Sequence, residues 1–127
     1  MDFKENPAIY IQIAEYVCEQ ILLKKWKLGD KIISIRDLAI NMEVNPNTVQ
    51  RAYDFLQQRA IITQKRGVGF FVEEDAMERI LLFRREQFME NELPVFMRNI
   101  FLLQIDFKEI KTLYEQFVKD NFKNKSL

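Results

Sequence analysis

The stretch between residues 35 and 59 constrains the fold more than any other part of this chain, because it carries two short amphipathic segments joined by a tight turn. The apolar residues of the first segment recur at helical spacing and are Leu38, Ala39 and Met42. Ser34 stands where a helix N-cap belongs, and the carboxylate of Asp37 follows three residues later, as in a capping box. This pattern predicts a helix that begins directly after Ser34.

The second segment also carries clear start signals. The Asn45 side chain can accept a hydrogen bond from the first turn, and Pro46 falls where a helix does not need an N–H. The predicted buried face consists of Val49, Ala52, Phe55 and Leu56, and the predicted outer face of Asn47, Thr48, Gln50, Arg51 and Asp54. This pattern is typical of a helix-turn-helix, whose second helix enters the major groove of DNA. An ordinary antiparallel helix pair in a bundle has the same local pattern and remains an alternative.

The residues after this pair favour a winged helix over a bundle. Residues 61–64 and 68–72 are β-prone, and Lys65-Arg66-Gly67 between them reads as a turn with two positive charges. We expect a β-hairpin with a basic tip that can reach a phosphate or the minor groove. Residues 31–33 are short and β-prone, and could add a third strand. The expected fold class is therefore mainly α with a small β-hairpin, with residues 1–72 as the DNA-binding domain.

Residues 73–127 predict a helical segment with more apolar side chains than it can bury alone. Pro94 should kink or split its long first helix, and Asp106 should cap its last one. Pairing with the same segment of a second chain would cover the apolar stripes and give a two-fold homodimer. The candidate interface residues are Ile80, Phe88, Phe96, Ile100, Phe101, Leu113 and Phe117. Folding of this tail back onto its own winged helix is the alternative.

Composition argues against several other classes of protein. The chain has no histidine and a single cysteine, Cys18, so the commonest general base and metal ligand are missing and no internal disulfide can form. We expect no catalytic site, no metal and no cofactor. No apolar run is long enough to span a membrane and no signal peptide is recognisable, so we expect a cytoplasmic protein without a membrane partner. The formal net charge is zero, so DNA binding would need a local basic patch.

Taken together, the motifs resemble the N-terminal winged-helix domain of the GntR family of bacterial transcription regulators, and the Asn-Pro-Asn-Thr-Val run with the short tail resembles its YtrA-type subfamily. The resemblance covers roughly residues 7–72. It rests on Ile9-Tyr10-x-Gln12-Ile13, Leu28-Gly29-Asp30-Lys31-Ile32, Ser34-x-Arg36-Asp37-Leu38-Ala39, residues 44–53 and Gly67-x-Gly69-x-Phe71-Val72.

The resemblance implies a set of DNA contacts. In the family, DNA is touched by an arginine of the first short helix, by the start of the recognition helix and by the wing tip. Together with the two cap residues and the wing lysine, the candidate DNA-binding residues are Ser34, Arg36, Asn45, Pro46, Asn47, Thr48, Gln50, Arg51, Lys65, Arg66 and Gly67. Arginine can bridge to phosphates or guanine edges, and Asn and Gln can pair with adenine edges.

This chain departs from the family pattern at several positions. Pro46 replaces an arginine that many relatives carry, Arg59-Ala60 replaces Glu-Gly, and Phe70 replaces a threonine of the wing motif. We expect the last two changes to shift the wing relative to the recognition helix. The resulting hypothesis is a homodimeric transcription regulator, by resemblance a repressor, on a pseudo-palindromic operator; a small-molecule effector is unknown. A winged-helix adaptor that binds protein instead of DNA is the alternative, and an enzyme is disfavoured because no catalytic constellation can be named.

Overall fold

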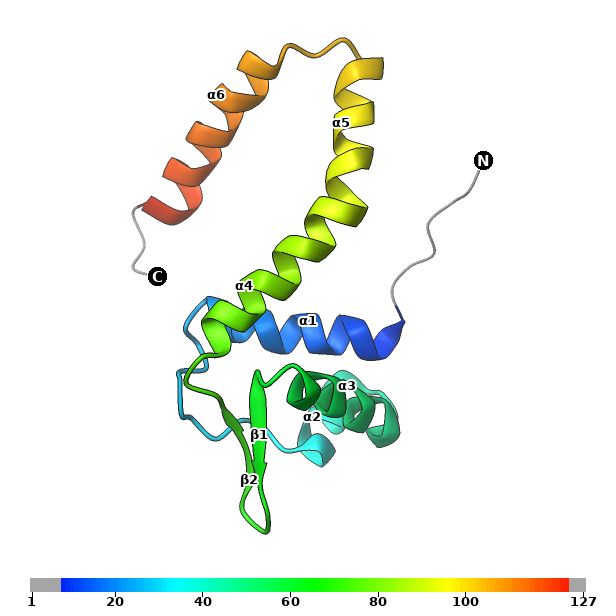
Figure 1. Ribbon diagram of the computed structural model, residues 1–127, viewed down its shortest axis with the longest axis vertical. Helices are drawn as coiled ribbons and strands as arrows, with labels where there is room; N and C mark the ends of the chain where they lie inside the picture. The colour runs from blue at the N-terminus through cyan, green and yellow to red at the C-terminus, as the bar shows by residue number, and fades with distance from the viewer. Residues whose placement is uncertain (1–7, 124–127) are drawn as a thin grey trace. The chain divides into compact units, whose positions relative to one another are not determined.

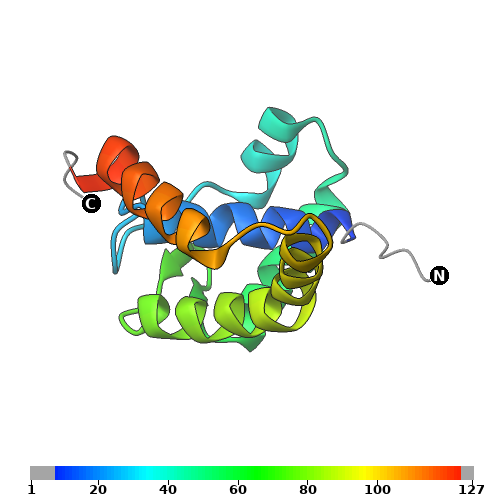
Figure 2. The ribbon, with the colours of Figure 1, turned by 90° about the horizontal axis from the view of Figure 1, so that it is seen from above.

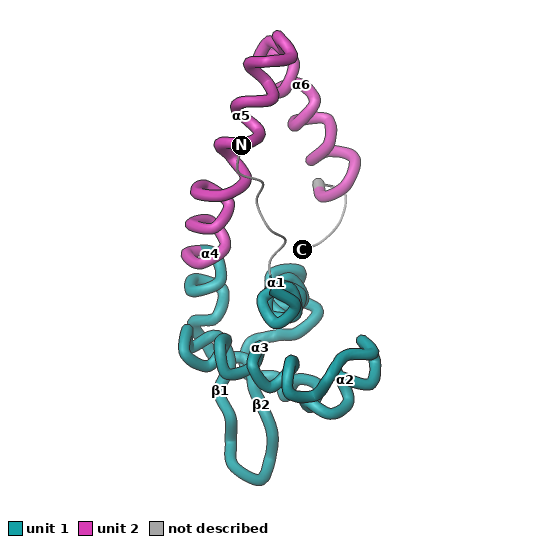
Figure 3. The backbone as a smooth tube through the Cα atoms, turned by 90° about the vertical axis from the view of Figure 1, so that its right-hand side faces the viewer, with its two compact units in different colours: residues 1–81 teal, residues 82–127 magenta. Residues whose placement is uncertain are grey.

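The computed structural model of the protein describes residues 8–123. The chain divides into two compact units, Met1–Leu81 and Leu82–Leu127 (Figure 3). The division falls inside helix α4 (Ala76–Gln87), because the early residues Ala76 and Ile80 of this helix are fully buried. It therefore lies later in the chain than residue 72, where the sequence pattern changes. Along residues 8–123, no helix is both long enough and apolar enough to cross a membrane.

The first unit is a winged helix-turn-helix, which confirms the predicted fold class (Figure 1). Its elements are α1 (Ile9–Leu22), α2 (Ile35–Met42), α3 (Pro46–Gln58), β1 (Ile62–Lys65) and β2 (Gly69–Val72), followed by the start of α4. The two strands pair antiparallel, with Ile62 opposite Val72 and Lys65 opposite Gly69. Helix α1 lies across α3 (Figure 2), and the hairpin projects away from α1 (Figure 1).

The two short helices begin as their caps predict. The Ser34 hydroxyl accepts a hydrogen bond from the Asp37 N–H at 3.1 Å, and the Asn45 side chain accepts one from the Asn47 N–H at 2.8 Å. Between the helices, Glu43 adopts a left-handed conformation with φ of 55°, and the Val44 N–H donates to the Ala39 carbonyl at 3.0 Å. These bonds satisfy backbone groups at both helix ends and fix the corner of the motif.

Tyr53 and Phe70 tie the hairpin to helix α3. Both side chains are buried, and their rings meet edge to face with centroids 4.9 Å apart. The Tyr53 hydroxyl donates a 2.6 Å hydrogen bond to the Ile33 carbonyl, and burial raises the pKa of this tyrosine. Phe70, the departure from the usual threonine, is therefore a core residue that holds β2 against α3.

Residues 31–33 contribute one bridge to the hairpin and not the third strand that their β-prone sequence would allow. Lys31 pairs antiparallel with Phe71, and the Ile32 N–H donates to the Phe70 carbonyl at 2.9 Å. The chain then turns into α2 at Ser34, so the ladder cannot continue. The sheet of the described residues consequently has two strands.

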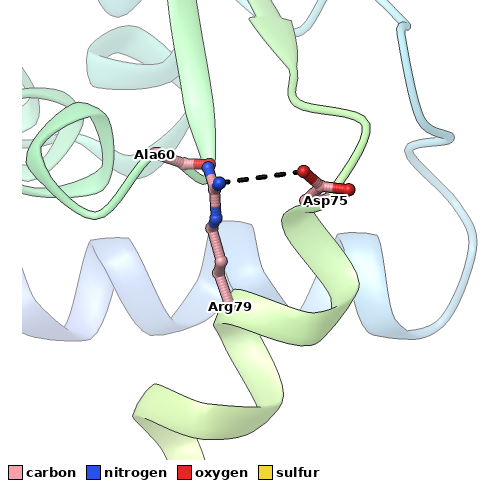
Figure 4. Close-up of polar contacts among 3 residues, drawn as sticks. All are labelled: Ala60, Asp75 and Arg79. Atoms are coloured by element: carbon pink, nitrogen blue, oxygen red, sulfur yellow. Dashed lines mark hydrogen bonds and ion pairs between the residues drawn. The ribbon is translucent and has the colours of Figure 1, made fainter.

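An arginine contact links the start of α4 to the turn that follows α3. The Arg79 guanidinium donates a 2.9 Å hydrogen bond to the Ala60 carbonyl and lies 3.7 Å from the Asp75 carboxylate (Figure 4). Ala60 itself has a positive φ of 56°. The family's glycine at this position would adopt this backbone conformation with less strain than alanine does.

The second unit continues α4 into η1 (Phe88–Glu92), α5 (Leu93–Leu102), α6 (Phe107–Val118) and η2 (Lys119–Lys123). The predicted disturbance at Pro94 takes the form of the π-helical turn η1, in which the Leu93 N–H donates to the Phe88 carbonyl. A regular α-turn would bring the proline ring against the carbonyl four residues earlier, which the wider turn avoids. The Asp106 side chain caps α6 by accepting from the Lys108 N–H at 2.9 Å.

Apolar side chains of the second unit remain exposed in the single chain. From Arg84 to Phe122 no residue is buried, and Phe101, Leu103 and Tyr114 expose 81%, 69% and 65% of their surface. The predicted interface residues Phe88, Phe96, Phe101, Leu113 and Phe117 all belong to this exposed set, and Ile100 is half-buried. The prediction of Ile80 as an interface residue is wrong, because the chain by itself already buries it completely.

Candidate nucleic-acid interface

The predicted DNA-binding residues all lie in the first unit, on three short segments. Ser34 caps α2 and Arg36 lies in its first turn. Asn45 caps α3, and Pro46, Asn47, Thr48, Gln50 and Arg51 lie in its first turns. Lys65 ends β1, and Arg66 and Gly67 follow it in the hairpin turn. Thr48 is half-buried, and the other members of the set are exposed. Burial of the opposite face of α3 turns these polar side chains outward, since Val49, Ala52, Tyr53 and Leu56 fill the core.

The first turns of α3 present amide, hydroxyl and guanidinium groups. The Gln50 amide nitrogen donates a 2.9 Å hydrogen bond to Asp54 one turn later. Both residues are exposed, so the bond orients the amide along the helix surface without removing it from solvent. Asn45 uses its side-chain oxygen for the cap, which makes it a backbone-fixing residue at the helix start.

Arg51 lies against an aromatic ring from another helix. Its guanidinium carbon is 4.0 Å from the ring centroid of Tyr10, in the first turns of α1. The two residues help to line an open depression of about 390 Å³, whose other lining residues are Ala8, Ile9, Asn45, Asn47 and Thr48. Four predicted site residues (Asn45, Asn47, Thr48 and Arg51) therefore share one hollow with the start of α1.

The hairpin turn gathers basic side chains. The Val68 N–H donates to the Lys65 carbonyl at 2.9 Å, and Gly67 in the turn has a φ of 77°, which glycine adopts without strain. The Lys65 ammonium lies 4.4 Å from the ring centroid of Phe71. Arg66 is exposed at the tip. The turn thus carries positive charge close to its backbone.

Lys31 is a further basic residue of the wing that sequence reasoning missed. Its side chain crosses the backbone of Gly69 so closely that an added Cβ there would lie 2.8 Å from the Lys31 Cε. Gly69 has a φ of 144°, which side-chain-bearing residues rarely adopt. The bridge between Lys31 and Phe71 is the structural cause, and no local sequence signal indicates a bridge of a single pair.

Tyr10 is the other residue that sequence reasoning missed at the site. Tyr10 lies in α1, far from Arg51 in the sequence, and only the packing of α1 on α3 reveals the contact between them. Among residues 8–123, no cluster of acidic residues, cysteine or histidine could hold a metal ion. The chemistry that the site offers is therefore hydrogen bonding and positive charge.

This winged helix-turn-helix with an exposed polar recognition helix is of the type found in bacterial regulators. The profile of the family described as "Bacterial regulatory proteins, gntR family" matches residues 9–72. The match spans α1 to the end of β2, so the chain belongs to the gntR family. The resemblance seen in the sequence is thereby confirmed.

Named relatives extend this result. The chain is 39% identical over 74 residues to the uncharacterized HTH-type transcriptional regulator YhcF of Bacillus subtilis, a stretch that covers 58% of this chain and 61% of the relative. It is 40% identical over 76 residues to the HTH-type transcriptional repressor YtrA of the same organism, covering 60% of this chain and 58% of the relative. The chain therefore matches about three fifths of the length of these curated relatives.

A solved structure is similar over nearly the whole chain. The GntR family transcriptional regulator from Listeria monocytogenes is 34% identical, with a TM-score of 0.70, and the match covers 90% of this chain and 98% of that one. The similarity therefore includes the second unit as well as the winged helix.

Proposed function

We propose that this protein is a homodimeric transcription regulator that binds a pseudo-palindromic operator and represses the genes behind it. The observation that carries the proposal is the polar, arginine-bearing outer face of α3, with its first turns exposed and its opposite face buried. The name of the relative YtrA, a transcriptional repressor, supports repression over activation. Membership of the gntR family supports DNA as the partner.

The side chains of this face suit direct reading of bases. Asn47 and Gln50 can each form two hydrogen bonds with an adenine edge, and Arg51 can do the same with guanine. The half-buried Thr48 suits a backbone phosphate, because its short side chain cannot reach as far as the longer Asn, Gln and Arg side chains. Lys31, Lys65 and Arg66 on the wing can neutralise phosphates beside the groove.

The apolar tail supports dimerisation. Helices α5 and α6 expose large side chains that cost free energy in water, at about 25 cal/mol for each Å² of apolar surface. Contact between η1, α5 and α6 and the same elements of a second chain would cover Phe88, Phe96, Ile100, Phe101, Leu113 and Phe117 in an isologous interface. Two recognition helices related by a two-fold axis would then match the two halves of an operator.

Salt dependence tests the proposal. We expect footprinting on the promoter upstream of the protein's own gene to give a protected, pseudo-palindromic site. Fluorescence anisotropy on that duplex should show affinity that falls on the order of a thousandfold between about 50 and 200 mM salt, because binding releases counterions from phosphates. Affinity that is absent or insensitive to salt would contradict the proposal and favour a protein-binding adaptor.

A matched pair of arginine variants sharpens this test. Arg66→Ala should lower the slope of log affinity against log salt by about one for each subunit, since each wing would lose one phosphate contact. Arg85→Ala removes the same charge from an exposed position of α4 and should leave the slope unchanged. Equal slopes for both variants and the unmodified protein would contradict a phosphate contact by the Arg66 side chain.

A further inference from the structure

The contact between Arg51 and Tyr10 joins the recognition helix to α1 at the predicted DNA-binding surface. The guanidinium carbon of Arg51 lies 4.0 Å from the Tyr10 ring centroid. The Tyr10 ring in turn meets the Phe55 ring edge to face, with centroids 6.2 Å apart. Phe55 belongs to α3 and is half-buried, so Tyr10 packs against the same helix that carries Arg51.

This stacking leaves the guanidinium able to bind DNA. A ring holds a guanidinium by its flat face, while all five N–H donors point outward in the plane of the group. Arg51 is exposed in the structure, so these donors are accessible to a base or a phosphate. A free arginine side chain loses rotamer entropy when it binds, and a side chain that is already stacked loses less.

The depression at the start of α3 places Tyr10 and Arg51 next to other predicted DNA-binding residues. Tyr10 and Arg51 line it together with Asn45, Asn47 and Thr48. We propose that Tyr10 is a positioning residue of the DNA-binding surface, which holds Arg51 in its binding conformation before DNA arrives. The inference rests on the proposed function and adds a residue of α1 to the recognition machinery.

A double-mutant cycle on operator affinity tests the inference. Tyr10→Leu should weaken operator binding about two- to fivefold, the range expected for an exposed cation–π contact. In the Arg51→Ala background the same Tyr10→Leu change should have no effect, because no guanidinium is left to position. Tyr10→Phe keeps the ring and should restore the affinity of the unmodified protein.

Tyr16→Leu is the matched control. Tyr16 lies on the same helix as Tyr10. Its ring meets the Trp26 ring edge to face, with centroids 6.1 Å apart, and its aromatic partner is therefore not the one that contacts Arg51. This variant removes an equal amount of ring surface and should leave operator affinity unchanged. Thermal unfolding of each variant separates a loss of folding from a loss of positioning. If Tyr10→Leu does not fold, Tyr10→Gln, a good helix former, gives the same comparison.

Unchanged operator affinity of Tyr10→Leu would overturn the inference alone, and two further results would do the same. One is a loss from Tyr10→Leu that is equally large with Arg51 present and in the Arg51→Ala background, which would show that Tyr10 acts independently of the arginine. The other is a loss in Tyr10→Phe as large as that in Tyr10→Leu, which would assign the effect to the hydroxyl. An unmodified protein that fails to bind its promoter would instead overturn the proposed function together with the inference.

Discussion

At the scale of single residues, Tyr53 connects the core to the geometry of the helix-turn-helix. Its ring is fully buried, and its hydroxyl reaches the Ile33 carbonyl just before the N-cap of α2. The tyrosine thus satisfies a backbone acceptor that lies at the edge of the core. One side chain of the recognition helix thereby fixes the entry of the chain into the preceding helix.

Tyr53→Phe should therefore lower the free energy of unfolding by about 1–2 kcal/mol at neutral pH, because it leaves the Ile33 carbonyl without this donor. The difference should shrink as pH rises past about 10. The folded state keeps Tyr53 protonated, since burial raises its pKa, while the unfolded state ionises near the ordinary value. The free energy of unfolding of the unmodified protein consequently falls as pH rises past about 10. The phenylalanine variant has no hydroxyl at this position and does not show this part of the fall. Urea unfolding at pH 7 and at about pH 10.5 measures both effects, and a constant difference would contradict the pKa assignment.

At the scale of elements, the capped helices and the hairpin could be predicted from the sequence because their signals are local. Asn45-Pro46 and Lys65-Arg66-Gly67 determine a helix start and a turn through their own backbone preferences. The role of Phe70, the bridge at Lys31 and the stacking on Tyr10 could not be predicted, since each depends on residues far apart in the sequence. The prediction for Ile80 failed because an apolar stripe alone does not say which neighbour covers it.

The two wing glycines should differ in their tolerance of alanine. Gly69→Ala places a side chain on a backbone with φ of 144° and displaces the Lys31 side chain, so we expect a loss of about 1–3 kcal/mol in unfolding free energy. Gly67→Ala meets nothing within 4 Å and should cost about 1 kcal/mol, from the positive φ of 77° alone. Thermal or urea unfolding compares the two directly. A larger loss at Gly67 would contradict the packing of Lys31 across Gly69.

At the scale of the whole molecule, the described structure combines a well-packed first unit with a second unit whose apolar side chains remain in water. The core of the first unit draws on α1, α2, α3, the hairpin and the start of α4. The second unit has no buried residue beyond Phe83 among those described. Large exposed apolar patches mark interaction sites, and the proposed homodimer would cover this one with the matching helices of a second copy.

Phe101→Asp should convert the proposed dimer into a monomer, because Phe101 is the most exposed large apolar side chain among the described residues and the proposed interface would bury a carboxylate in its place. Sedimentation equilibrium measures the oligomeric state, and operator affinity should fall with it. Ile40→Asp is the control, since Ile40 is 63% exposed on α2 and its replacement should leave the mass of the assembly unchanged. An unchanged mass for Phe101→Asp would argue that the tail is covered in another way.

The π-helical turn before Pro94 also changes the angular position around the helix axis of every side chain that follows it. A π-turn holds more residues than an α-turn, so the phase of the side chains after it advances by about 100° for each extra residue. A helical wheel drawn straight through the turn would therefore put Phe96 and Ile100 on the wrong azimuth relative to Leu82. In homologous chains, a one-residue gap at residues 88–92 would mark where this phase correction has been gained or lost.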